Sequence, residues 1–228
     1  MGPTGTGRPA SSDGERGPLR TDAERNRSRI VVAARQVFAE QGLEAPLTEV
    51  ARRAGVGPAT LYRRFPSRED LITGAFAGKM TAYADAVEAA LRDPDPWQGF
   101  CGYLTQICGM QAADRGFTHV LTRTFPTAKA FEAERVRAYL GFTELIQRAQ
   151  DIGRLRVDFR PEDLVVLLMA NAGVVAATEA AAPDAWRRFV AYMIQAFGAE
   201  NADPLPPPAT PQAMYRAMIR LGDPEEPL

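Results

Sequence analysis

The stretch LTEVARRAGVGPATLYRRF, residues 47–65, most constrains what this chain can fold into. It predicts two short helices joined by a tight turn. Thr48 is placed to cap the first helix, and Gly55 supplies the left-handed backbone that ends it. Gly57 and Pro58 open the second helix, because proline is favoured at the first helical position. This layout is typical of a helix-turn-helix, whose second helix lies in the major groove of DNA.

Helical periodicity continues on both sides of this stretch, and no segment has the period of a strand, so the predicted fold class is all-α. Thr21 and Glu24 form a capping box that predicts a helix start. An apolar stripe over residues 72–91 predicts one helix of about 35 Å that links the front and the rear of the chain. We expect four parts, namely a disordered basic arm at 1–20, a three-helix domain at 21–66, a larger helical domain at 67–200, and a proline-rich tail with a possible short helix at 201–228.

The rear of the chain contains further helix signals. Ser67 and Asp70 form a second cap, and Thr127 is expected to cap a long helix that ends at Gly153. A row of glycines in the helix after residue 96 implies close approach by another helix or by a ligand. The residues expected to face inward from the long helix are Val136, Tyr139, Leu140, Thr143 and Ile146.

The net charge of −1 hides an asymmetry. Up to Lys79 the chain has 13 Lys and Arg against 9 Asp and Glu, whereas the rest has 14 against 19. A basic front suggests that only this part meets a polyanion. The N-terminus lacks the apolar region of a signal peptide, and the longest apolar run, residues 164–178, is shorter than the ~18 residues of a membrane span. We therefore expect a cytoplasmic protein without a membrane partner.

Motifs for catalysis are missing from the sequence. It has no Gly-rich phosphate loop, no CxxC pair, no HExxH and no GxSxG. Cys101, Cys108 and His119 could in principle bind a metal, completed by Asp114 or Glu144, but their spacing favours buried core residues without a metal. The sequence therefore predicts no enzyme, no cofactor and no metal site.

An apolar ligand pocket is predicted in the rear domain. Aromatic and sulfur residues are spread over four helices there, with a few polar neighbours, as in many ligand sites. An ordinary core has the same composition, so both interpretations stay open at this point. The candidate pocket residues are Trp97, Tyr103, Gln106, Met110, Phe117, His119, Phe125, Tyr139, Phe142 and Asn171.

Two consecutive apolar helices near the end, at about 161–180 and 183–198, predict a subunit interface. They are too apolar for a fully exposed surface, although both could simply belong to the core. The candidate interface residues are Val166, Ala170, Val174, Trp186, Phe189, Val190 and Met193.

Residues 30–71 resemble the DNA-binding region of the TetR family of transcriptional regulators. A shorter pattern in the rear, at 153–164, is similar to one that recurs in the ligand domains of this family. Two positions depart from the family's pattern, since Pro58 replaces a small polar residue and Arg68 replaces the usual lysine. The matching residues are Ile30, Ala33, Ala34, Phe38, Gly42, Leu47, Thr48, Val50, Ala51, Ala54, Gly55, Val56, Gly57, Ala59, Thr60, Leu61, Tyr62, Phe65, Ser67, Arg68, Glu69 and Leu71.

The resemblance implies a homodimer that binds a palindromic double-stranded DNA operator and is released from it by a small hydrophobic effector. Arg63 is the first candidate for a base contact, because arginine to guanine is the commonest specific pairing. The alternatives are an all-α ligand carrier or enzyme, and a dimeric interaction module without a ligand. The candidate DNA contacts are Thr48, Arg52, Gly57, Pro58, Ala59, Thr60, Tyr62, Arg63 and Arg68.

Overall fold

The computed structural model describes residues 16–123, 125, 128–200 and 203–220. This part of the chain forms ten helices and contains no strand, apart from an isolated antiparallel bridge between Leu155 and Gly198. The all-α prediction is therefore confirmed. The helices are α1 (Arg16–Gln41), α2 (Leu47–Ala54), α3 (Pro58–Arg64), α4 (Arg68–Leu91), α5 (Pro96–Ala113), α6 (Arg115–Thr122), α7 (Lys129–Asp151), α8 (Pro161–Thr178), α9 (Ala185–Phe197) and α10 (Pro211–Arg220).

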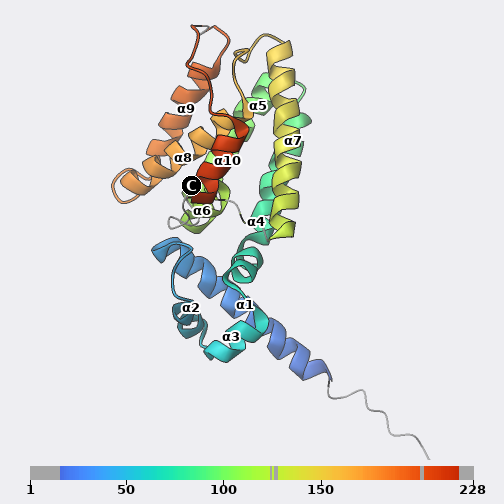
Figure 1. Cartoon of the computed structure of the whole chain (residues 1–228), viewed down its shortest axis with the longest axis vertical. Helices are drawn as coiled ribbons and strands as arrows, with labels where there is room; N and C mark the ends of the chain where they lie inside the picture. Colours follow the sequence, from blue (N-terminus) through green and yellow to red (C-terminus); the bar gives the residue numbers. More distant parts are fainter. Residues whose placement is uncertain (1–15, 124, 126–127, 201–202, 221–228) are drawn as a thin grey trace, which may run out of the picture.

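The first three helices form a small unit, the head, at one end of the molecule, and α5 to α10 form a larger body at the other end (Figure 1). Helix α1 lies behind α2 and α3 and supplies Ile30 and Phe38 to their shared core. Val50 and Leu61 enter that core from α2 and α3 and are 0% and 1% exposed. Burial of these apolar side chains holds α2 and α3 against α1, because helices of eight and seven residues are only marginally stable alone.

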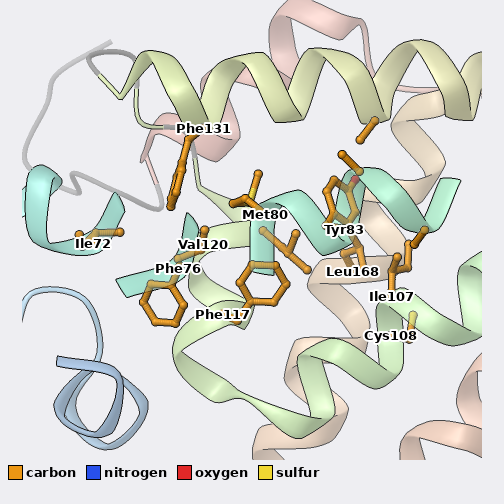
Figure 2. Close-up of a cluster of buried hydrophobic side chains, with 14 of the residues drawn as sticks. Ile72, Phe76, Met80, Tyr83, Ile107, Cys108, Phe117, Val120, Phe131 and Leu168 are labelled. Carbon is orange, nitrogen blue, oxygen red and sulfur yellow. The ribbon is translucent and has the colours of Figure 1, made fainter. Parts of the chain in front are cut away.

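Helix α4 connects the head to the body, as its sequence predicts (Figure 1). It begins with the predicted capping box, in which the Ser67 hydroxyl accepts from the Asp70 backbone N–H and the Asp70 carboxylate accepts from the Ser67 N–H. Its 24 residues span about 36 Å at 1.5 Å per residue. Figure 2 shows Phe76, Met80 and Tyr83 along its buried side, facing residues of α5 to α8.

Three predicted helix starts differ from the structure. Helix α1 begins at Arg16, so it extends N-terminally past the Thr21 box into the segment that was expected to be disordered. Helix α2 begins at Leu47 with Pro46 as its cap, and Thr48 makes no side-chain cap. Helix α7 begins after Ala128, and the predicted cap Thr127 lies outside the described residues.

The predicted inward face of α7 is wrong for most of its residues. Val136, Tyr139 and Leu140 are 55%, 49% and 63% exposed, and Thr143 is also exposed, whereas Ile146 is buried. Helix α7 packs on α4 through its small residues, because a Cβ on Gly141 would lie 2.8 Å from Val87 Cγ1. The face of α7 that packs against α4 is therefore the one with small side chains, and not the one with the largest apolar side chains. The α7 side chains that are buried are Phe131, Ala138, Phe142, Leu145, Ile146 and Ala149.

Helix packing explains why two of the three glycines in the predicted row on α5 have no side chain. A Cβ on Gly99 would lie 2.5 Å from the Ala90 carbonyl oxygen at the end of α4, and one on Gly109 would lie 3.2 Å from the Trp186 ring of α9. Gly102 is exposed and has nothing within 4 Å of the Cβ position. Gly99 and Gly109 thus allow the close approach of neighbouring helices.

The tail contains a helix that packs on the body. Helix α10 lies across the space between α7 and α8 (Figure 1), and Met218 on it is 7% exposed. Met214 on the same helix is half-buried. The short helix that the sequence suggested around Met214 and Tyr215 is therefore present and docked.

Candidate nucleic-acid interface and ligand pocket

The turn between α2 and α3 has the geometry that its sequence predicts. Gly55 has φ +62°, and the backbone there closes onto the Ala51 and Arg52 carbonyls. This left-handed conformation strains any residue with a Cβ, which explains the glycine. Gly57 caps α3 and Pro58 occupies its first turn. The turn thereby fixes the angle at which α3 leaves α2.

The outer face of α3 is exposed. Tyr62 is 48% exposed, Arg63 is exposed next to it, and Leu61 on the opposite side is buried in the head. Gly57, Pro58 and Ala59 are exposed at the start of the helix, and Thr60 is half-buried. Arg63 forms no hydrogen bond or ion pair with any described residue, so its donors point to solvent. The structure thus brings the candidate DNA contacts of α3 together on one surface.

Other arginines of the head stabilise its own packing. Arg29 donates to the Gly55 carbonyl at 3.2 Å and so holds the turn from α1. Arg64 donates to the Ala23 carbonyl at 2.9 Å, and the Arg27 guanidinium lies 5.6 Å from the centroid of the Phe65 ring. These three side chains tie α3 and its flanking turns to α1.

Arg68 is also engaged within the protein, although it was predicted to hold a phosphate. Its Nη1 donates to the Leu43 and Ala45 carbonyls at 2.6 and 2.7 Å, and its Nε lies 3.8 Å from the Glu44 carboxylate. These contacts fasten the loop between α1 and α2 to the start of α4. We therefore remove Arg68 from the candidate DNA contacts and assign it to the loop.

Arg52 lies on the surface of α2 but is paired. It donates twice to the Glu49 carboxylate, both at 2.8 Å, and Arg53 donates to the same carboxylate at 3.2 Å. The hydrogen bond from Arg52 is the main reason why the pKa of Glu49 falls to about 2, and Arg53 contributes less. Thr48 is exposed on the same helix. A phosphate that approaches Arg52 must therefore compete with Glu49.

The body contains a cavity of about 740 Å³ between α7, α8 and α10, which α4 and α6 also reach. Only Tyr139 and Phe142 of the predicted pocket residues line it. Glu132, Arg135 and Glu162 also line the cavity and were not predicted from the sequence, and neither were the lining residues of α10. The remaining lining residues are Tyr83, Leu121, Val136, Pro161, Leu164, Val165, Leu168, Pro211, Gln212, Met214, Tyr215, Arg216 and Met218.

Most other predicted pocket residues belong to the core. Trp97, Tyr103, Phe117 and Phe125 are at most 9% exposed, and none of them lines the cavity. The aromatic rings pack on one another, for example Tyr103 on Phe142 with centroids 5.3 Å apart. The abundance of aromatic residues in the rear domain predicted a pocket, but these side chains pack on one another and fill the core.

The predicted polar orienters do not line the large cavity either. Asn171 is fully buried and donates to Gln111 Oε1 at 2.8 Å and to the Cys108 carbonyl at 3.3 Å, so it joins α8 to α5. Gln106 is exposed on α5, and Met110 is half-buried against the core. These three positions therefore serve helix packing or face solvent.

His119 lines a second cavity of about 310 Å³ between α6 and α8. Burial lowers the pKa of His119, and the charges of Arg123 and Arg115 lower it further, so the ring is neutral at pH 7. Burial also raises the pKa of Cys101 to about 11 and that of Cys108 to about 12, so both thiols are protonated. No cluster of three or more His, Cys, Asp or Glu among the described residues is arranged to hold a metal ion.

The predicted interface residues separate into two groups. Trp186 and Val190 are 5% and 2% exposed inside the core of their own chain, so they do not form an exposed interface. Val166 is 52% exposed and Ala170 is exposed on the outer side of α8. Tyr192, which was not predicted, is 54% exposed on the outer side of α9. The half-buried members of the predicted set are Val174, Phe189 and Met193.

Helix α8 is long and apolar enough to cross a membrane by length and composition, and it is the one such helix in the described part of the chain. A third of it is buried inside the protein. Core helices pass the same test, and α8 packs beside α9 and α5 (Figure 1).

Comparison with known proteins gives two family models. Residues 30–75 match the model described as bacterial regulatory proteins, tetR family, and residues 95–196 match the C-terminal domain of SbtR-like transcriptional regulators. The HTH-type transcriptional regulator BetI of Rhizobium meliloti is 30% identical over 132 residues, or 58% of this chain and 57% of BetI. An HTH-type transcriptional regulator of Staphylococcus aureus is 41% identical over 54 residues, or 23% of this chain and 29% of that protein.

The chain thus spans less than two thirds of either relative. Among solved structures, the transcriptional regulator FadR from Bacillus subtilis, in complex with stearoyl-CoA, superposes with a TM-score of 0.59. The match covers 75% of this chain and 96% of that one at 13% identity, so it concerns the fold alone.

The contacts of Arg68 and Arg63 generate a paired prediction. Arg68→Ala should lower the free energy of unfolding by about 1–2 kcal/mol, because two charge-assisted hydrogen bonds to the α1–α2 loop are lost. Arg63→Ala should stay within about 0.5 kcal/mol of wild type, because that side chain contacts solvent. Urea unfolding followed by circular dichroism measures both. An Arg68→Ala protein as stable as wild type that has lost only DNA affinity would restore the phosphate role of Arg68.

Proposed function

The chain belongs to the TetR family of bacterial transcriptional regulators, and from this premise we propose that it is a ligand-responsive, homodimeric repressor. The observation that carries the proposal is the outer face of α3, where Arg63 is exposed and unpaired on a head that the other arginines make rigid. A second feature, the 740 Å³ cavity in the body, supplies a place for an effector. The FadR structure of the same fold was solved with stearoyl-CoA bound.

Helix α3 is proposed to enter the major groove. Arg63 is placed to donate to guanine, and Tyr62 and Thr60 flank it on the same helix. The start of α3, residues 57–59, lies next to the backbone of the operator in this arrangement. Thr48 and Arg52 on α2 are proposed to contact phosphates, and for Arg52 the contact replaces part of its pairing with Glu49.

The exposed face of α8 and α9 is proposed as the dimer interface. Val166, Ala170 and Tyr192 are apolar or aromatic and exposed there, next to the half-buried Val174 and Phe189. Removal of such exposed apolar side chains from water favours association. A two-fold dimer would place two α3 helices on one side, about 34–36 Å apart, to bind a palindrome.

A chain of contacts leads from the cavity to the head. Arg135 lines the cavity and donates to the carbonyls of Val120, Leu121 and Arg123, at 3.2, 3.4 and 2.7 Å, so it holds the C-terminal end of α6. Arg123 in turn donates to the Glu44 carboxylate at 3.1 Å, on the loop that Arg68 fastens. An effector that displaces Arg135 or Leu121 would move the end of α6 and with it the α1–α2 loop. The effector shifts the equilibrium only if it binds the DNA-incompetent state more tightly.

The two alternatives have less support. No cluster of three or more His, Cys, Asp or Glu among the described residues could hold a metal ion, and both family models belong to regulators. An interaction module without a ligand would need no large cavity, and this body has one.

The proposed base contact can be tested on operators chosen by binding-site selection from random DNA. Arg63→Ala should lose about 1–3 kcal/mol of discrimination at one base pair of each half-site, since an arginine–guanine pair contributes that much. Fluorescence anisotropy with selected and single-base variant duplexes measures it. Arg92→Ala, an exposed arginine at the far end of α4, serves as the control and should bind like wild type. Equal discrimination by Arg63→Ala and wild type would remove α3 from the groove.

The interface predicts that Val166→Glu produces monomers, because two like charges would be brought together in an apolar contact. Sedimentation velocity over a range of concentrations measures the oligomeric state. Val157→Glu, at a 79% exposed position outside α8 and α9, is the matched control and should leave the dimer intact. If Val166→Glu sediments like wild type, the interface lies elsewhere.

The contact chain predicts that Arg123→Ala weakens the response to an effector more than it weakens either binding event. Loss of the Arg123–Glu44 pair removes one connection between α6 and the head, so the coupling free energy should fall by about 0.5–2 kcal/mol. Operator affinity with and without a saturating effector measures this coupling. Arg115→Ala, which removes an exposed pair between α6 and Glu179, is the control. Unchanged coupling in Arg123→Ala would rule out this route.

A further inference from the structure

The charges that line the large cavity are unequally compensated. They are Glu132, Glu162, Arg135 and Arg216. The terminal nitrogens of Arg135 donate to carbonyls at the end of α6, and its Nε lies 3.6 Å from the Glu132 carboxylate but forms no hydrogen bond with a described residue. Arg216 is exposed on α10 and donates to the Gln212 carbonyl of its own helix. For Glu162, the fourth charged residue, no hydrogen bond or ion pair with a described residue is found.

Glu162 is a buried carboxylate without a partner. It is 9% exposed, and it forms no hydrogen bond or ion pair with any described residue. It is not needed to cap α8, because Asp163 accepts the Arg160 N–H at 2.8 Å. Glu162 lies in the first turn of α8, where the partial positive charge of the helix N-terminus attracts negative groups. Burial of an unpaired charge is unfavourable, so such a group in a cavity indicates a ligand that neutralises it.

The other residues that line the cavity suit an organic cation, because some are aromatic and others are apolar. Tyr83, Tyr139, Phe142 and Tyr215 line the same cavity, and aromatic faces attract ammonium groups. The cavity also has an apolar side made by α8 and α10. Its residues there include Leu164, Leu168, Met214 and Met218.

We propose that the effector is an organic cation, an ammonium group on an apolar chain, whose charge pairs with Glu162. The apolar chain lies along α8 and α10, and the aromatic rings contact the ammonium group. This inference rests on the proposed function only in treating the cavity as the effector site. A carboxylate ligand would instead pair with Arg216, which is exposed and has no acidic partner among the described residues, whereas Arg135 already lies beside the Glu132 carboxylate.

The test uses four probes of equal chain length, namely octylammonium, octyltrimethylammonium, octanol and octanoate. Isothermal titration calorimetry on the full-length protein without DNA should give at least tenfold tighter binding of the two cations than of octanol, and the weakest binding for octanoate. Glu162→Gln should lose at least tenfold for the cations and leave octanol unchanged. Glu144→Gln, a 54% exposed carboxylate on α7 outside the cavity, is the matched control and should bind every probe like wild type.

Thermal unfolding provides a second readout that does not require binding by the variant. Empty Glu162→Gln should unfold at a higher temperature than empty wild type, because a buried unpaired charge has been removed. Tighter binding of octanoate than of the cations, or equal cation binding by Glu162→Gln, would overturn the proposal. Because these measurements contain no DNA, they are independent of the proposed function. If the bound cation leaves operator affinity unchanged, ligand-induced release fails while the ligand class stands.

Discussion

A stack of three phenylalanine rings joins the head to the body. Phe76 of α4 lies between Phe38 of α1 and Phe117 of α6, with ring centroids 6.4 and 6.2 Å apart. The contact is close, because a Cβ on Gly116 would lie 2.9 Å from Phe76 Cζ and 3.3 Å from the Ala39 nitrogen. Such packed side chains transmit displacements instead of absorbing them. The stack therefore ties the head to α4 and α6, in addition to the Arg123–Glu44 pair.

The parts of the fold that local signals determine could be predicted from the sequence. The Gly55 turn, Pro58 at the start of α3, the Ser67–Asp70 box and the continuous α4 each follow from the backbone preferences of a few neighbouring residues. The start of α1 was predicted wrongly, since the box at Thr21 lies inside a longer helix. A capping motif is thus a local preference that a continuing helix can override.

The cavity could not be predicted, for two physical reasons. The orientation of α7 depends on Gly141, whose lack of a side chain allows α4 to approach, and it leaves Val136 and Tyr139 exposed at the cavity while Phe142 is buried. Periodicity alone favours the face with the larger apolar residues and misses this close approach. The unpaired state of Glu162 is likewise a property of its neighbours in space, because Glu162 and Asp163 have the same sequence signal and different roles. The division of the head arginines into structural and exposed ones has the same origin.

The position of α10 has a consequence for how ligand preference can diverge. It packs on the outside of α8 yet supplies six of the residues that line the cavity, and it follows the segment matched by the C-terminal family model. Among the described helices, α10 makes its main contact with α8. Substitutions in this one terminal segment can therefore reshape the cavity without disturbing the folded frame. A new ligand preference can therefore evolve through α10 while the helices that hold the head stay unchanged.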